Sequence, residues 1–212
     1  MTYEYGYSLD HPHNMAIWEA QFGDFFNTAQ VVIDTFLTNS ENKWLRQNAL
    51  TLILPHGYDG AGPEHSSCRI ERFLQLANSD GKIRSKKLTT DKSQPLSMDS
   101  EYFWEDIQSA NFSFVFPTKP ANIFHVLRRQ MKRNFRKPLI IAGPKGLLRH
   151  NKATSKLEEM GPGSKFERIW KHRNVENISN CEVVVLCSGK FVYDIDEILE
   201  KEKKDRTALL TI

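Results

Sequence analysis

The stretch 49-ALTLILPHGYDGAGPEHSSCRIERFLQLA-77 decides the fold class, because an apolar run, a glycine-rich polar loop and an amphipathic segment follow one another directly. Residues 49–54 are apolar or Thr and stop at Pro55, which predicts a buried strand. Apolar residues three and four apart within 68–77 predict a helix. A strand, a loop at the strand's end and a helix are the usual layout of an α/β binding site.

The segments on either side continue the alternation of helix and strand. Spacing of apolar residues predicts helices over 13–38 and 120–135, and short apolar runs predict strands over 112–116 and 139–142. Residues 78–111 are polar and contain several lysines, and are expected to be an exposed insertion.

A second folded portion is expected after the polar residues 150–180. There the sequence predicts a strand over 183–187, a helix over 190–202 and a strand over 207–212. A lone β-α-β unit cannot bury both faces of its sheet, so we expect a second domain that is cut short. The predicted division is a first domain over 1–150, a linker over 151–180 and a partial domain over 181–212.

Composition excludes some classes of protein. No apolar run approaches the roughly 18 residues of a membrane span, and the net charge of +3 gives no nucleic-acid footprint. The basic cluster 128-RRQMKRNFRK-137 is expected to form a solvated helix face. Three cysteines without a C-x-x-C pair favour a reducing compartment.

The loop 55-PHGYDGAGPEHSSCR-69 is the strongest functional signal. His56 and His65 are candidate proton donors or acceptors, with a plain surface loop as the alternative. The glycine order G-x-x-G-x-G matches neither nucleotide motif, and the histidine pairs lack a third zinc ligand, so no metal site is expected. Cys68 is expected to be a structural thiol rather than a nucleophile.

The aromatic segment 17-IWEAQFGDFFNTAQ-30 carries a second candidate site. Gly23 interrupts its helical pattern at a cost of about 1 kcal/mol, so something other than helix propensity selects it. Phe22 and Phe25 offer flat rings for a planar heterocycle, although such stripes are more often plain core.

Taken together, WEAQFGDF, LPHGYDGAGPEHSS, FHVLRRQ, FRKPLII and PKGLLRH resemble motifs of the 2-oxoglutarate dehydrogenase family of thiamine enzymes. They occur in the family's order over nearly the whole chain. Several stretches are most similar to the branch that acts on 2-oxoadipate, with the 2-oxoglutarate branch as the alternative. Asp59 stands where the latter carries a longer Glu, which is weak support, since one methylene discriminates by only about 1 to 3 kcal/mol.

The resemblance implies a transketolase-like pyrimidine-binding domain, with a mostly parallel sheet flanked by helices, followed by a partial second α/β domain. It implies thiamine diphosphate as cofactor, with Phe22, Phe25 and Gln21 at its pyrimidine ring and His56 and His65 as catalytic residues. It further implies oxidative decarboxylation of a 2-oxo dicarboxylic acid, acyl transfer to a lipoyl-bearing acyltransferase subunit, a homodimer and the mitochondrial matrix.

Departures from the family lead us to expect an incomplete unit. The family's activating glutamate falls upstream of residue 1, and the domain that binds diphosphate through magnesium is missing. We therefore expect the chain alone to be inactive. A degenerate homologue kept as a non-catalytic interaction subunit, and one half of a split enzyme, remain alternatives.

Overall fold

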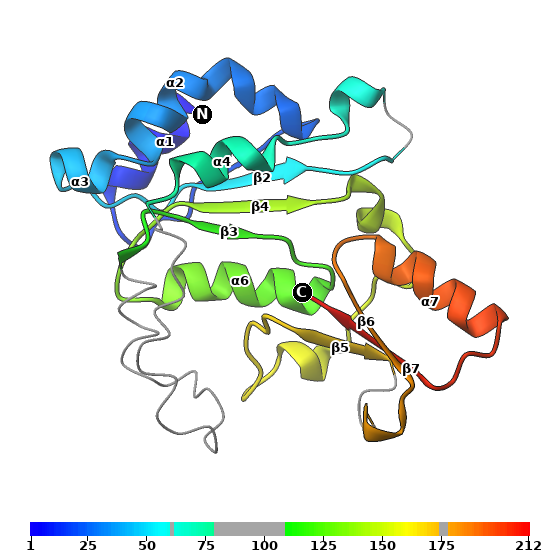
Figure 1. Ribbon diagram of the computed structural model, residues 1–212. Helices are drawn as coiled ribbons and strands as arrows, with labels where there is room; N and C mark the ends of the chain where they lie inside the picture. The colour runs from blue at the N-terminus through cyan, green and yellow to red at the C-terminus, as the bar shows by residue number, and fades with distance from the viewer. Residues whose placement is uncertain (60–61, 79–108, 174–177) are drawn as a thin grey trace, which may run out of the picture.

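The computed structural model describes residues 1–59, 62–78, 109–173 and 178–212. Its first sheet has four strands in the order β1-β2-β4-β3, and every neighbouring pair is parallel (Figure 1). The strands are β1 (Ile17–Glu19), β2 (Thr51–Pro55), β3 (Ser113–Val115) and β4 (Leu139–Gly143). This parallel α/β sheet confirms the fold class expected from the sequence.

The two central strands are buried because both faces of the sheet are covered. Leu52 and Leu54 of β2 and Ile140 of β4 are fully buried. Near-continuous apolar runs are typical of parallel strands that are covered on both sides. This explains why 49–54 and 139–142 gave clear sequence signals.

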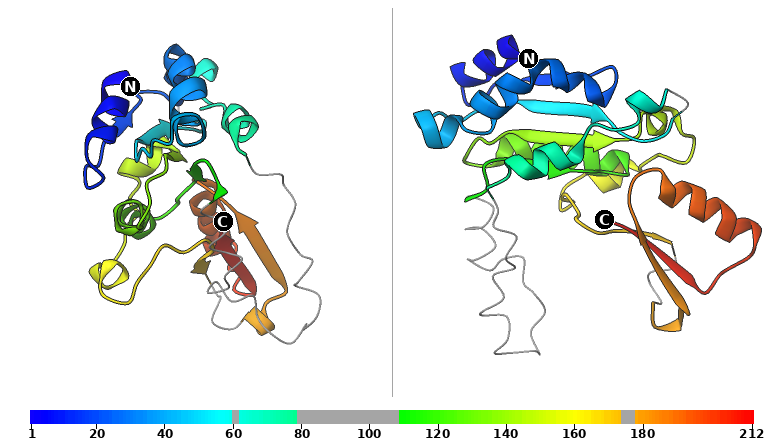
Figure 2. Two further views of the ribbon diagram at one scale, coloured as in Figure 1. Left: turned by 90° about the vertical axis from the view of Figure 1, so that its left-hand side faces the viewer. Right: turned by 45° about the horizontal axis from the view of Figure 1, so that its top comes forward.

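Most helices of the first unit cover one face of the sheet, and α6 covers the other (Figures 1 and 2). Phe26 and Phe73 fill the first face, whereas Val126 of α6 packs on Leu139 and Ile141 of β4 on the second. The helical segments are α1 (Thr2–Asp10), η1 (Gly23–Ala29), α2 (Gln30–Val32), η2 (Ile33–Leu37), α3 (Ser40–Trp44), η3 (Pro63–His65), α4 (Ile70–Leu76), α6 (Pro120–Lys132) and η5 (Lys145–Arg149).

The helix expected over 13–38 was only partly correct. The structure places strand β1 at Ile17–Glu19, and helical backbone begins at Gly23 as a 3₁₀ turn that continues through α2 into a π turn. The apolar spacing reflected burial of Phe26, Ile33 and Leu37 rather than one regular helix. The insertion expected over 78–111 lies almost wholly outside the described residues.

A second, three-stranded sheet follows, in the order β5-β7-β6. Strand β6 is parallel to β7, as the predicted β-α-β unit requires, and helix α7 packs Val192 and Tyr193 into the core beside Leu209. Its elements are β5 (Trp170–Arg173), η7 (Ile178–Asn180), β6 (Val183–Cys187), α7 (Phe191–Lys201) and β7 (Thr207–Thr211).

Strand β5 falls inside the stretch that the sequence suggested was a linker, and it pairs antiparallel with β7. Before it, residues 153–169 run along α6 as a strap that includes the 3₁₀ turn η6 (Leu157–Met160). The strap is fixed to the helix because the side chain of Asn122 bonds both backbone groups of Glu167, each at 3.0 Å, and the His125 ring lies 2.8 Å from the carbonyl oxygen of Glu159.

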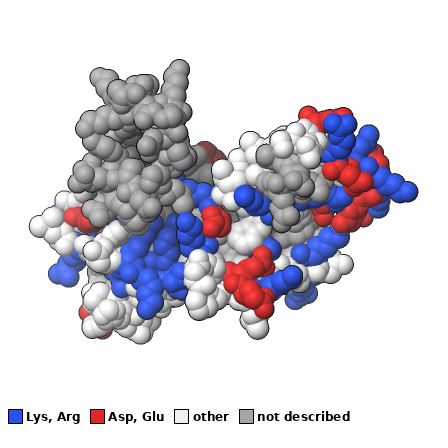
Figure 3. All heavy atoms as spheres, turned by 90° about the horizontal axis from the view of Figure 1, so that it is seen from below, with Lys and Arg blue, Asp and Glu red and all other residues white. Residues whose placement is uncertain are grey.

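The basic cluster was expected to be a solvated face, which is wrong for four of its six cations. Arg128 and Lys132 are exposed, but Arg129 and Arg133 are half-buried, and Arg136 and Lys137 are buried. The helix ends at Lys132, and the Arg136 guanidinium then turns back to donate to carbonyl oxygens at the helix's end. Figure 3 views the molecule from the side of α6 and shows Lys and Arg gathered there.

Within the described ranges, no helix is both long enough and apolar enough to cross a membrane.

Candidate functional site

A cavity of about 340 Å³ opens at the carboxyl ends of β2 and β4. Ligands of parallel α/β sheets bind at this edge, since the loops that follow neighbouring strands meet there. The cavity is lined by Phe22, Pro55, His56, Gly57, Asp59, His65, Lys145, Gly146, Leu148 and Arg149.

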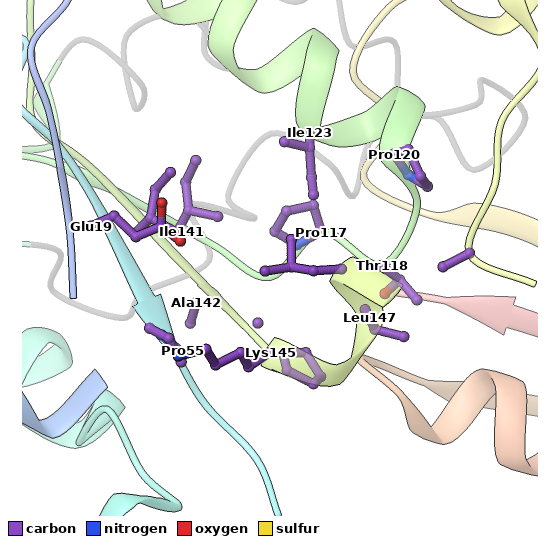
Figure 4. Close-up of a pocket in the computed structure, with 15 residues that line it drawn as sticks. Glu19, Pro55, Pro117, Thr118, Pro120, Ile123, Ile141, Ala142, Lys145 and Leu147 are labelled. Atoms are coloured by element: carbon purple, nitrogen blue, oxygen red, sulfur yellow. The ribbon is translucent and has the colours of Figure 1, made fainter. Parts of the chain in front are cut away.

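An apolar cavity of about 290 Å³ lies next to it and shares Pro55, Lys145 and Leu148 (Figure 4). It lies between the ends of β2 and β4 and the start of α6, where Ile123, Pro117 and Ile141 form its wall. Glu19 and Lys145 are the charged residues in its lining. The site therefore has a polar compartment that holds the histidines and an apolar one beside it.

The loop after β2 is held by backbone hydrogen bonds at both ends. The His56 N–H donates to the carbonyl oxygen of Gly143 at 2.8 Å, and the Gly57 N–H donates to that of Ser66 at 2.7 Å. Gly57 has φ of 134°, a region that side chains disfavour, so this turn requires glycine. Asp59 then accepts the Gly146 N–H at 2.7 Å, which ties the loop to the end of β4.

His56 is fixed by the start of the next helix. Its Nδ1 accepts the backbone N–H of Cys68 at 3.1 Å. Burial lowers the pKa of His56, against an opposing effect of Glu71. Burial also raises the pKa of the Cys68 thiol to about 12, in agreement with a structural thiol rather than a nucleophile.

His65 lies in a cluster of aromatic rings with a carboxylate. Its ring stacks on Phe22, with centroids 4.1 Å apart and planes at 9°, and meets the edge of Phe25 at 5.2 Å. Its Nδ1 lies 3.0 Å from a carboxylate oxygen of Asp24, which is only 8% exposed. The ring is thus held in both plane and rotation.

Gly23 explains how Asp24 reaches His65. A Cβ at this position would lie 2.0 Å from the Pro55 carbonyl oxygen and 2.6 Å from the Cys68 Cβ. Real Cβ atoms do not approach so closely, so glycine alone lets η1 pack directly against the end of β2. The residue that interrupted the helical pattern in the sequence is required by this close approach.

The predicted site residues are only partly brought together. Phe22, His56 and His65 line one cavity, whereas Phe25 and Gln21 are not among its lining residues. Phe25 keeps 38% of its surface exposed beside Phe22. The Gln21 carbonyl oxygen accepts a hydrogen bond from the Lys145 ammonium group at 2.7 Å. The same ammonium group lies 4.9 Å from the centroid of the Phe22 ring.

Asp24, Lys145 and Arg149 were not among the site residues predicted from the sequence. Asp24 belongs to the motif WEAQFGDF, and the two cations belong to PKGLLRH directly after β4. For Lys145 and Arg149 the available signal was a motif directly after the strand predicted over 139–142, whereas for Asp24 it was its place between Phe22 and Phe25 in WEAQFGDF. Across the described part of the chain, no group of three His, Cys, Asp or Glu side chains is placed to hold a metal ion.

Comparison with known proteins supplies independent findings. Residues 1–151 match the family model described as "Transketolase, pyrimidine binding domain", and residues 154–212 match "2-oxoglutarate dehydrogenase C-terminal". The chain is 47% identical over its full length to a probable 2-oxoadipate dehydrogenase complex component E1 homolog of Dictyostelium discoideum, and covers 22% of that protein.

Two further relatives come from an animal and a bacterium. The 2-oxoadipate dehydrogenase complex component E1 of Danio rerio is 49% identical over the full chain, which covers 21% of it. The 2-oxoglutarate dehydrogenase E1 component of Rickettsia felis is 45% identical over 93% of the chain, which covers 17% of it. The chain thus spans about a fifth of the length of the relatives it matches.

Proposed function

The chain belongs to the transketolase pyrimidine-binding domain family, and from that premise we propose that it forms the pyrimidine side of a thiamine-diphosphate site in a 2-oxo acid dehydrogenase component E1. The observation that carries the proposal is the polar cavity at the carboxyl ends of β2 and β4. Two histidines and an aromatic ring converge there, from two of the motifs that resemble the family.

The residues present fit an aromatic heterocycle. His65 covers one face of Phe22, so the part-exposed ring of Phe25 is the more open stacking surface. We propose that Gln21, whose carbonyl oxygen is bonded to Lys145, also contacts the heterocycle. The cofactor would supply the electron sink for decarboxylation. We assign its diphosphate and magnesium to protein outside this chain.

The histidines and cations act on the substrate. We propose that both histidines are catalytic: His56 donates to the substrate's carboxylate and stabilises the charge that develops as carbon dioxide leaves, and His65 exchanges a proton with the reacting group. Lys145 and Arg149 line the same cavity and give its wall positive charge. Such charge attracts a doubly charged acid and raises its local concentration.

We propose 2-oxoadipate as the substrate, with 2-oxoglutarate as the alternative. The names of the Dictyostelium discoideum and Danio rerio relatives support the first and that of the Rickettsia felis relative supports the second. The Asp59 carboxylate accepts a hydrogen bond from the Gly146 N–H, and a side chain longer by one methylene would extend further into the cavity. This favours the longer acid, by no more than about 1 to 3 kcal/mol.

The partners are part of the same proposal. A lipoyl-bearing acyltransferase subunit would receive the acyl group, a second copy of the component would complete a homodimer, and the assembly would work in the mitochondrial matrix. The names of the relatives, which are components of a dehydrogenase complex, support an assembly of this kind.

A chimera tests the proposal. Residues 1–212 replace the matching segment of the Danio rerio relative, and the rate of 2-oxo acid decarboxylation is measured with each acid. We expect activity, a higher kcat/KM for 2-oxoadipate, and loss of activity in His56→Ala. A chimera that assembles and melts like its parent, yet decarboxylates neither acid, would contradict the proposal.

A further inference from the structure

The two histidines of the cavity are bonded through their Nδ1 atoms to partners of opposite kind. His65 Nδ1 meets a carboxylate oxygen of Asp24 at 3.0 Å, whereas His56 Nδ1 meets the backbone N–H of Cys68 at 3.1 Å. An ionised carboxylate only accepts hydrogen bonds, and a backbone N–H only donates them. Each contact therefore decides where its imidazole carries a proton.

For His65, the proton is held on Nδ1. Asp24 can bond this nitrogen only if the nitrogen donates, so Nε2 is the atom that gains or loses a proton. The exposed carboxylate of Glu64 lies 3.8 Å from Nε2, which is beyond a hydrogen bond. Neutral His65 thus presents a lone pair on Nε2.

For His56, the arrangement is reversed. Its Nδ1 must accept the Cys68 N–H, so the proton of the neutral ring is on Nε2. Burial lowers the pKa of His56, which favours this neutral form. The ring then presents a fixed N–H donor.

We propose that Asp24 is a positioning residue that makes His65 the proton acceptor of the site, opposite His56 as the fixed donor. This rests on the proposed function for its catalytic meaning. An acceptor and a donor lining one cavity can move one proton and stabilise one developing negative charge at the same time. Asp24 acts only through His65. The stack on Phe22 fixes the plane of the His65 ring, so that the ring keeps its contact with Asp24.

The tautomers can be read directly by two-bond ¹H–¹⁵N correlation spectra of the 212-residue chain labelled at histidine, recorded above the titration of the rings. His56→Gln and His65→Gln assign the two signals. We expect His65 to be protonated almost wholly on Nδ1 and His56 on Nε2. A wild-type His65 protonated mainly on Nε2 would overturn the proposal.

Asp24→Asn tests the cause. An amide can donate as well as accept, so we expect the His65 population to shift to a majority of the Nε2–H form while His56 stays unchanged. Asp34→Asn is the matched control, because Asp34 accepts from Gln30 in the helical segment that follows and should leave both tautomers as they are. An unchanged His65 tautomer in Asp24→Asn would contradict the assignment. The spectra need neither substrate nor cofactor, so an inactive chimera would count against the proposed function and not against this assignment.

Discussion

Replacing Gly23 with alanine should destabilise the chain strongly, although it adds a single methyl group. The new Cβ would lie 2.0 Å from the carbonyl oxygen of Pro55. An ordinary carbon–oxygen contact is about 3.3 Å, so η1 and the end of β2 must separate by about 1.3 Å. The obstructing atom belongs to the backbone of a buried strand, and cannot rotate away as a side chain would.

The expected loss is at the upper end of the range for overpacked sites, about 3 kcal/mol. For a chain of this length that corresponds to a melting temperature lower by about 6 to 12 °C. Urea unfolding and thermal melting, both followed by circular dichroism, measure the change.

Gly6→Ala is the matched control. Gly6 lies inside α1, and a Cβ there would meet nothing within 4 Å. The same chemical change should stabilise this position by about 0.5 to 1 kcal/mol, because alanine favours helix. A Gly23→Ala variant whose free energy of unfolding stays within about 0.5 kcal/mol of the wild type would show that the close approach at Gly23 does not require glycine.

Three other perturbations test other parts of the structure. Asn111→Ala removes side-chain bonds to Asn78, Thr38 and Leu76 and should cost about 2 to 4 kcal/mol in urea unfolding, whereas exposed Asn134→Ala should change little. Cys68 should be the last thiol alkylated by iodoacetamide near neutral pH, since burial raises its pKa to about 12. Mass spectrometry that finds Cys68 modified before the half-buried Cys181 would contradict this. Asp196→Asn removes the buried acid that Arg173 contacts at 2.9 Å, with Lys152 and His172 nearby, and should lower the free energy of unfolding by about 1 to 3 kcal/mol. A loss no larger than in the exposed pair variant Glu197→Gln would argue against it.

The strands that could be predicted most clearly are those with an uninterrupted apolar run, which are buried in β2 and β4 and largely exposed in β6. Strands β2, β4 and β6 come from uninterrupted apolar runs, and the structure places β6 at Val183–Cys187 as expected. Strand β1 has three residues at a sheet edge, and β5 consists of Trp170 to Arg173, which are mostly polar. Such strands form because a neighbour offers hydrogen bonds, and their own residues do not reveal it.

The residues of the site likewise fall into those that local sequence reveals and those that only tertiary packing brings together. The histidines could be found from the sequence, because the loop that carries them follows directly after a strong strand. Asp24 is 41 residues from His65, and only the close packing that Gly23 permits brings them together. A contact of this kind depends on tertiary structure, so no spacing rule would have found it.

The strap along α6 has a mechanical consequence. A pulling force on Ile212 would load β7, which is bonded on one side to β6 and on the other to β5. Strand β5 passes the load into the strap, and Asn122 and His125 pass it on to α6. Tension at Ile212 would therefore be carried from the second sheet to α6, the helix that packs on the first sheet.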